Sequence, residues 1–103
     1  LAVTRGYDHN FVLAPSPGPT ARLYSPQTGI TMEVETSMPG LQLYTAGFLD
    51  ERRGKGGVIY RPRHAVCLES QYYPDAIHHS AFPSPVLRNG EWYDHHTCYR
   101  FYA

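Results

Sequence analysis

Nine prolines are spread along this chain of 103 residues, a distribution that disfavours long helices. Proline lacks a backbone N–H donor, so it is excluded from the interiors of helices and of central strands. No window shows apolar residues recurring with the 3.6-residue period of an amphipathic helix. Short strand-like runs separated by turn signals instead predict an all-β fold, arranged as an antiparallel β-sandwich.

The segment 30–36 is the clearest strand in the sequence. Its apolar side chains are expected to face inward and its polar ones outward: Ile30, Met32 and Val34 against Thr31, Glu33 and Glu35. The segment 41–45 alternates in the same way after a Pro39-Gly40 turn, so the two runs predict a pair of neighbouring antiparallel strands. Shorter strands are expected at 20–25 and 97–102, and surface loops at 50–57 and 72–85.

A further strand is predicted over 63–71, with Glu69 near its end. A carboxylate in mid-strand is unfavourable to bury without partners, so Glu69 either faces solvent or belongs to a site. Asp8 is the other carboxylate that fits a purely structural role poorly, although an Asx turn before a strand is its structural alternative. Glu33 and Glu35 are interpreted as a solvated face, and Asp75 as a turn residue after Pro74.

Composition excludes several classes of partner. Nine Lys and Arg balance nine Asp and Glu, so the sequence predicts no binding to nucleic acid or to an acidic membrane surface. No apolar run approaches the roughly 18–20 residues of a membrane span. Cys67 and Cys98 are expected to be reduced thiols of a cytoplasmic protein, with a single disulfide as the alternative. The adjacent histidine pairs at 78–79 and 95–96 lack metal-ligand spacing, so no metal site is predicted.

Six short blocks stand out in the sequence: Gly6-Tyr7-Asp8-His9-Asn10-Phe11, Met38-Pro39-Gly40-Leu41-Gln42-Leu43-Tyr44-Thr45, Gly54-Lys55-Gly56-Gly57, Cys67-Leu68-Glu69-Ser70-Gln71, Pro74-Asp75-Ala76 and Phe82-Pro83-Ser84. In their order and spacing they strongly resemble the aldose 1-epimerase (galactose mutarotase) family, over nearly the whole chain. The resemblance implies part of the large antiparallel sandwich of that family, the galactose mutarotase-like supersandwich.

The resemblance also implies an activity, the interconversion of the α and β anomers of a free hexose such as galactose or glucose. It makes Glu69 the general base, and it makes Asp8 and Gln42 the residues that contact sugar hydroxyls. It implies no metal and no organic cofactor. A related hexose-phosphate epimerase would need a basic cluster for the phosphate, whereas Arg52, Arg53 and Lys55 are interpreted as loop charges.

The general acid of the family is a histidine from a region N-terminal to all six blocks, and this chain has no counterpart of that region. We therefore expect residues 1–103 to be the C-terminal portion of a single mutarotase-like domain, incomplete on its own. The N-terminal remainder, as a separate chain, is the expected partner besides the sugar. A catalytically inactive carbohydrate-binding or interaction module, or a non-functional fragment, is the alternative. The preferred sugar and the oligomeric state stay open.

Overall fold

The structure, a computed structural model, describes residues 2–103; Leu1, which the predicted domain includes, lies outside the described residues. Within that range the chain forms short strands and two single-turn 3₁₀ helices, and no α-helix. The strands are β1 (Asp8–Val12), β2 (Ala21–Tyr24), β3 (Thr31–Thr36), β4 (Gly40–Tyr44), β5 (Arg52–Arg53), β6 (Ile59–Tyr60), β7 (Cys67–Gln71) and β8 (Thr97–Tyr102). The 3₁₀ helices are η1 (Lys55–Gly57) and η2 (Ala76–His78).

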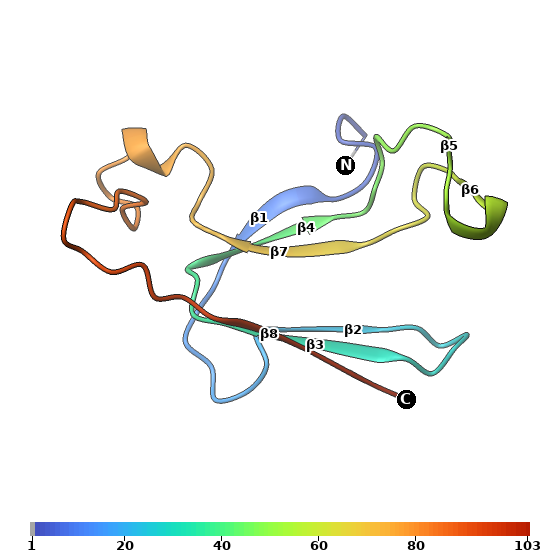
Figure 1. Ribbon diagram of the computed structural model, residues 1–103, viewed down its shortest axis with the longest axis horizontal. Coiled ribbons are helices and arrows are strands. Elements are labelled where there is room, and N and C mark those ends of the chain that lie inside the picture. Colours follow the sequence, from blue (N-terminus) through green and yellow to red (C-terminus); the bar gives the residue numbers. More distant parts are fainter. Residues whose placement is uncertain (1) are drawn as a thin grey trace.

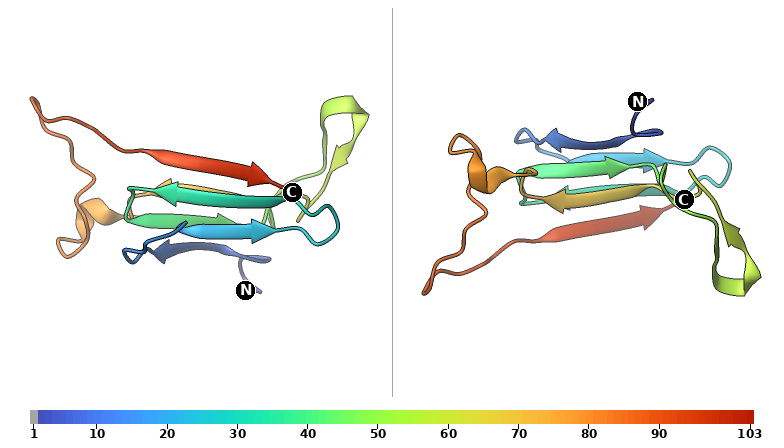
Figure 2. Two further views of the ribbon diagram at one scale, coloured as in Figure 1. Left: turned by 90° about the horizontal axis from the view of Figure 1, so that it is seen from below. Right: turned by 90° about the horizontal axis from the view of Figure 1, so that it is seen from above.

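Six of these strands form two antiparallel sheets that lie face to face (Figure 1). The first sheet has the strand order β1-β4-β7, and the second has the order β2-β3-β8. Strands β5 and β6 form a separate hairpin. Figure 2 shows the edge strands β1 and β2 along one side of the sandwich, and β7 and β8 along the other. The predicted all-β antiparallel sandwich is therefore confirmed.

Strands β3 and β4 are consecutive in the sequence, but they belong to different sheets. The prediction that 30–36 and 41–45 are neighbouring antiparallel strands is wrong, because β3 pairs with β2 and β8 and β4 pairs with β1 and β7. The link between them carries the chain across the sandwich, and its Met38 is buried with 8% of its surface exposed. Alternation identifies the buried face of a strand but does not identify its partner.

The inner faces of the two sheets meet around Val34, which is fully buried, and Leu41, which is 4% exposed. Two polar contacts join the sheets along the β7–β8 side. The Tyr99 hydroxyl donates a hydrogen bond to the Leu68 carbonyl at 2.8 Å, and the Ser70 and Thr97 hydroxyls lie 2.7 Å apart. These contacts define which face of each sheet points inward, and the opposite faces are the outer faces.

The core is thin and opens toward one end of the sandwich. Val34 is buried as predicted, but Ile30, also expected to face inward, is 48% exposed, and Phe101 is 64% exposed. The radius of gyration is 16.3 Å, against about 13 Å for a compact chain of this length. The accessible surface is 7934 Å², against about 5,900 Å² for a compact monomer of 11.7 kDa. Much apolar surface is therefore left uncovered by the described residues.

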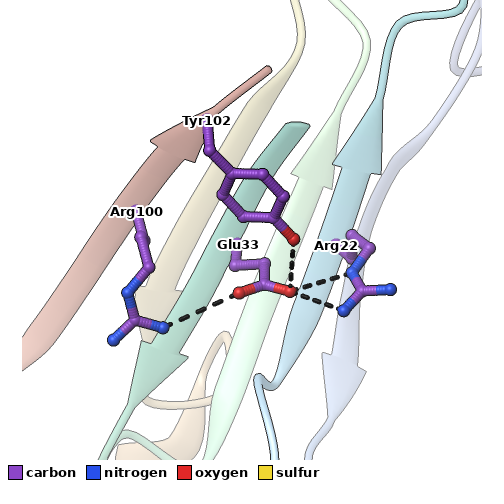
Figure 3. A network of polar contacts seen from close by, with 4 residues as sticks. All are labelled: Arg22, Glu33, Arg100 and Tyr102. Atoms are coloured by element: carbon purple, nitrogen blue, oxygen red, sulfur yellow. Dashed lines mark hydrogen bonds and ion pairs between the residues drawn. The ribbon is translucent and has the colours of Figure 1, made fainter. Parts of the chain in front are cut away.

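Glu33, predicted to be a solvated side chain, is only 9% exposed. It lies on the outer face of the second sheet, where Arg22 donates to its Oε1 from Nε and Nη2 at 2.9 and 2.6 Å (Figure 3). The Tyr102 hydroxyl donates to the same oxygen at 2.9 Å, and Arg100 Nη1 lies 3.7 Å from Oε2. The hydrogen bonds from Arg22 and then Tyr102 hold the pKa of Glu33 below its ordinary value. The carboxylate points outward as predicted, but its neighbours cover it.

Local backbone conformations account for the other differences. Asp8 belongs to strand β1 and not to an Asx turn. Strand β7 begins at Cys67 and not at residue 63, because Pro62 is followed by Arg63 at a φ of +68°, which an extended strand cannot accommodate. The segment 72–85 is irregular as expected except for η2.

Both cysteines are free. Cys67 pairs with Tyr44 on the outer face of the first sheet, and Cys98 pairs with Glu35 on the outer face of the second. The two thiols therefore lie on opposite sides of the sandwich. No helix of the described residues is long and apolar enough to cross a bilayer.

Candidate active site

A row of polar side chains crosses the outer face of the first sheet. Asn10 on β1 pairs with Gln42 on β4, and Gln42 pairs with Glu69 on β7. Residues directly opposite in an antiparallel pair point to the same face, with Cβ atoms about 4.5–5.5 Å apart. Asp8 and Gln71 share this face because each lies two positions from a member of the row. We call these five residues the polar face.

Alternation in each strand exposes the polar face. The apolar residues between its members, Leu41 and Leu43 on β4 and Leu68 on β7, turn toward the second sheet. Burying these leucines leaves Gln42 and Glu69 no orientation but outward, because successive strand residues point to opposite faces. The hydrophobic pattern of the sequence thus positions the site.

Hydrogen bonds link four members of the polar face. Gln42 Nε2 donates to Asp8 Oδ1 at 2.7 Å. Gln71 Nε2 donates to Gln42 Oε1 and to Asn10 Oδ1, both at 3.0 Å. The structure therefore brings all three predicted site residues, Asp8, Gln42 and Glu69, onto one face, and it connects the first two directly.

Glu69 differs from the rest of the polar face. Its side chain is exposed, and among residues 2–103 the carboxylate has neither a hydrogen bond nor an ion pair. A carboxylate that is free of cations and donors keeps all its lone pairs for a ligand proton. Such a group can act as a general base toward a hydroxyl placed over the sheet.

No histidine accompanies Glu69 on this face. His9 lies on β1, but it pairs with Leu43 and so points to the inner side, where its ring contacts Tyr7. His64 lies in the turn before β7 and not on a strand of the sheet. In the part of the chain that the structure describes, no three His, Cys, Asp or Glu side chains gather as a metal site would require.

The sequence interpretation assigned no role to Asn10 or Gln71. A signal for Gln71 existed, since alternation places it on the face of Glu69. Asn10 likewise stands two positions after Asp8. Their contact with each other could not be foreseen, because β1 and β7 are separated by β4 and only the observed register brings them together.

The structure thus shows an antiparallel sandwich with carboxylates and amides gathered on one open sheet face. Residues 2–100 match the family model described as Aldose 1-epimerase. The chain is 43% identical over 99 residues to human galactose mutarotase and 36% identical over 104 residues to the aldose 1-epimerase of Escherichia coli K12. The chain belongs to the aldose 1-epimerase family.

A solved structure shares the fold. The GalM/aldose epimerase homologue from C. elegans superimposes with a TM-score of 0.81 at 31% identity, over 93% of this chain and 30% of that one. The match to the human protein covers 93% of this chain and 29% of the relative, and the match to the bacterial protein covers 96% and 30%. The chain thus spans under a third of the length of these relatives.

Proposed function

We propose that this chain carries the sugar-binding and proton-accepting face of an aldose 1-epimerase. Glu69 is the general base, and Asp8 and Gln42 bind hydroxyls of a free hexose such as galactose or glucose. The observation that carries the proposal is the register that sets an unpaired Glu69 directly beside Gln42 on an open face. Relatives named galactose mutarotase and aldose 1-epimerase support this reaction and this class of substrate.

The reaction needs one base and one acid. Glu69 accepts the proton of the anomeric O1 hydroxyl while the bond between C1 and the ring oxygen breaks and the ring oxygen takes up a proton from the acid. The resulting open-chain aldehyde turns about its C1–C2 bond. Reclosure returns both protons and yields the other anomer. A positioned base of this kind contributes about 10²–10⁴ in rate.

The polar face provides the base but not the histidine that the family uses as its acid, since the outward side chains of β1, β4 and β7 include no histidine. We place the acid in the N-terminal remainder of a mutarotase-like domain, of which residues 1–103 form the C-terminal portion. The greater length of the relatives and the open core support this assignment. That remainder, in the same or in a separate chain, is the partner that would cover the uncovered apolar surface.

The charge of the polar face favours neutral sugars. Asp8 and Glu69 both carry negative charge, and no cation on the same strands offsets them. A sugar phosphate or a uronic acid would meet repulsion from two carboxylates. This argues for a free hexose and against a hexose phosphate. The cytoplasm remains the predicted location.

A second function deserves a test, because the polar face lacks an acid. A catalytically inactive carbohydrate-binding module would retain Asp8, Gln42 and Glu69 as ligands for hydroxyls. Such a module would bind galactose or glucose in calorimetry and leave the rate of mutarotation unchanged.

Polarimetry of freshly dissolved α-galactose and α-glucose decides between the two functions. The whole protein, with any partner chain that accompanies it, should accelerate the approach to the equilibrium rotation. Glu69→Gln should lower that rate by at least about 100-fold, the lower range for a general base. Glu35→Gln is the matched control, an exposed glutamate on the other sheet, and should retain the parent rate. Equal rates for the parent and Glu69→Gln would remove Glu69 from the mechanism.

A further inference from the structure

We propose that Gln71 is a positioning residue for sugar binding, which fixes the amide of Gln42 in one orientation. The inference rests on the proposed function. It starts from the hydrogen bonds that run from Asp8 through Gln42 to Gln71 and on to Asn10. We call this series the amide relay. It crosses all three strands of the first sheet.

The direction of the amide relay is set at Asp8. An ionised carboxylate only accepts hydrogen bonds, so Gln42 must present its Nε2 group to Asp8, at 2.7 Å. Its Oε1 then points the other way and requires a donor. Gln71 Nε2 is that donor, at 3.0 Å. Without Gln71 the Gln42 oxygen would lose its hydrogen-bond donor. Only the hydrogen bond to Asp8 would then oppose a rotation of the amide group by 180°.

Gly40 provides the space that the amide relay needs. Gln71 pairs with Gly40 in the register, and a Cβ at Gly40 would lie 2.5 Å from Asn10 Oδ1 and 3.0 Å from Tyr73 Cδ1. Gly40 is not among the residues with positive φ, so the need for glycine here is one of space and not of backbone conformation. The missing side chain lets Gln71 reach over β4 to Asn10 on β1, at 3.0 Å.

The amide relay determines what a sugar meets. Both N–H groups of Gln71 are used within it, whereas Gln42 keeps one N–H for a ligand. A hydroxyl bound over the sheet therefore finds a donor at Gln42 beside the acceptor oxygens of Glu69. Reversing the Gln42 amide would replace that donor with an acceptor and misalign the sugar. Gln71 acts through Gln42 and not on the reacting atoms.

Kinetics of the whole enzyme with galactose test the role. Gln71→Met keeps the length of the side chain and removes its donors. It should raise KM about tenfold, the effect of one misdirected hydrogen bond, and change kcat by less than about threefold. Gln27→Met, at an exposed turn glutamine, is the matched control and should match the parent. A purely structural role would instead lower the active fraction, and hence the apparent kcat, at constant KM. That result, or an unchanged KM, overturns the proposal.

A ligand-free measurement separates this inference from the proposed function. In ¹⁵N–¹H spectra of the whole protein, the side-chain amide signals of Gln42 should move in Gln71→Met and in Gly40→Ala, and stay in place in Gln27→Met. Unmoved Gln42 signals would mean that Gln71 does not hold the amide, whatever the kinetics show. A parent protein that fails to accelerate mutarotation, with Gln42 signals that move as expected, would instead refute the proposed function and with it the role in sugar binding.

Discussion

The two sheets of the sandwich each carry an outward carboxylate, and the two carboxylates differ in their partners. On the second sheet Glu33 lies on the central strand β3, flanked by Arg22 on β2 and by Arg100 and Tyr102 on β8. On the first sheet Glu69 lies on the edge strand β7 beside Gln42, with no cation and no hydroxyl donor among the described residues. The same residue type is saturated with partners in one place and left open in the other.

This difference separates a structural carboxylate from one available for chemistry. Glu33 has donors for its lone pairs and holds three strands together, so it has little capacity to accept a ligand proton. Glu69 adds nothing comparable to the cohesion of its sheet. Its lone pairs remain for a ligand, and the amide relay beside it organises the surface where that ligand would lie.

A partner for Glu69 like that of Glu33 would abolish the difference between the two carboxylates. Gln42→Arg would place a guanidinium directly across the strand pair, as Arg22 lies across from Glu33. An ion pair would hold the carboxylate in its charged form, and we expect the mutarotation rate of the whole protein to fall by about 100-fold or more in polarimetry.

Two controls accompany this variant. Gln42→Leu removes the same amide without adding a charge, and it should raise KM with a smaller loss of kcat. Gln27→Arg adds the charge at an exposed turn and should leave the rate unchanged. A rate for Gln42→Arg no lower than that of Gln42→Leu would show that pairing Glu69 has no consequence.

A second substitution disturbs the first sheet alone. Gly40→Ala introduces a Cβ 2.5 Å from Asn10 Oδ1 and 3.2 Å from the Gln71 carbonyl oxygen, so neighbouring groups must shift. We expect the free energy of unfolding in urea to fall by about 1–3 kcal/mol, as for other overpacked sites. Gly18→Ala, with nothing within 4 Å of its added Cβ, is the control and should be neutral or slightly stabilising. Equal stabilities for the two variants would contradict the crowding at Gly40.

The ion pair and hydrogen bonds of Glu33 on the second sheet predict that the free energy of unfolding depends on pH through this carboxylate. Because its pKa is lowered in the folded protein, mainly by hydrogen bonding to Arg22, ionised Glu33 stabilises the fold above its ordinary pKa of 4.5. That contribution is lost as the pH falls through the lowered value. Glu33→Gln should therefore lower the free energy of unfolding at pH 7, and the difference from the parent should shrink below about pH 4.

Urea denaturation of the whole protein at pH 7 and pH 3 measures this difference. The effect should be smaller than that of Gly40→Ala, because Arg22 and Arg100 have side chains that are 62% and 60% exposed and water screens the pair. Glu69→Gln is the counterpart on the first sheet and should show no comparable loss at pH 7. A difference for Glu33→Gln that widens in acid would reverse the assigned sign.

The smallest effect is expected where the two sheets touch. Tyr99→Phe removes the hydroxyl that donates to the Leu68 carbonyl at 2.8 Å. We expect a loss of about 0.5–1.5 kcal/mol in the free energy of unfolding. Tyr93→Phe is the matched control, since the hydroxyl of this exposed tyrosine makes no hydrogen bond among the described residues. Identical losses in both variants would mean that the hydrogen bond between the sheets makes no net contribution to the free energy of unfolding.

The strand positions were largely predictable from the sequence, and their pairing was not. The segments 30–36, 41–45 and 97–102 form strands close to the expected bounds, because alternation and turn residues act locally. The predicted pairing of 30–36 with 41–45 was wrong because the three residues that link the two strands are enough to carry the chain from one sheet to the other. One of the two partners of β3 is β8, which lies more than 60 positions further along the chain, so no local pattern could identify it.

The candidate site was predictable in part. Alternation alone placed Glu69 and Gln71 on one face, and the resemblance to the aldose 1-epimerases selected Asp8, Gln42 and Glu69. Their gathering on one face is a product of the register of β1, β4 and β7. The burial of Glu33 was missed because the side chains that cover it come from β2 and β8, and no local pattern reports on them.

The class of fold, the outward direction of Thr31, Glu33 and Glu35 and the family of the chain follow from the sequence alone, since alternation, turn chemistry and motif spacing are properties of short segments. Which outward carboxylate is paired and which is free depends instead on the tertiary structure. Partners across a sheet come from distant parts of the chain, and the electrostatic surroundings of a side chain are set by those partners. Glu33 and Glu69 look alike in the sequence, and their neighbours make them different.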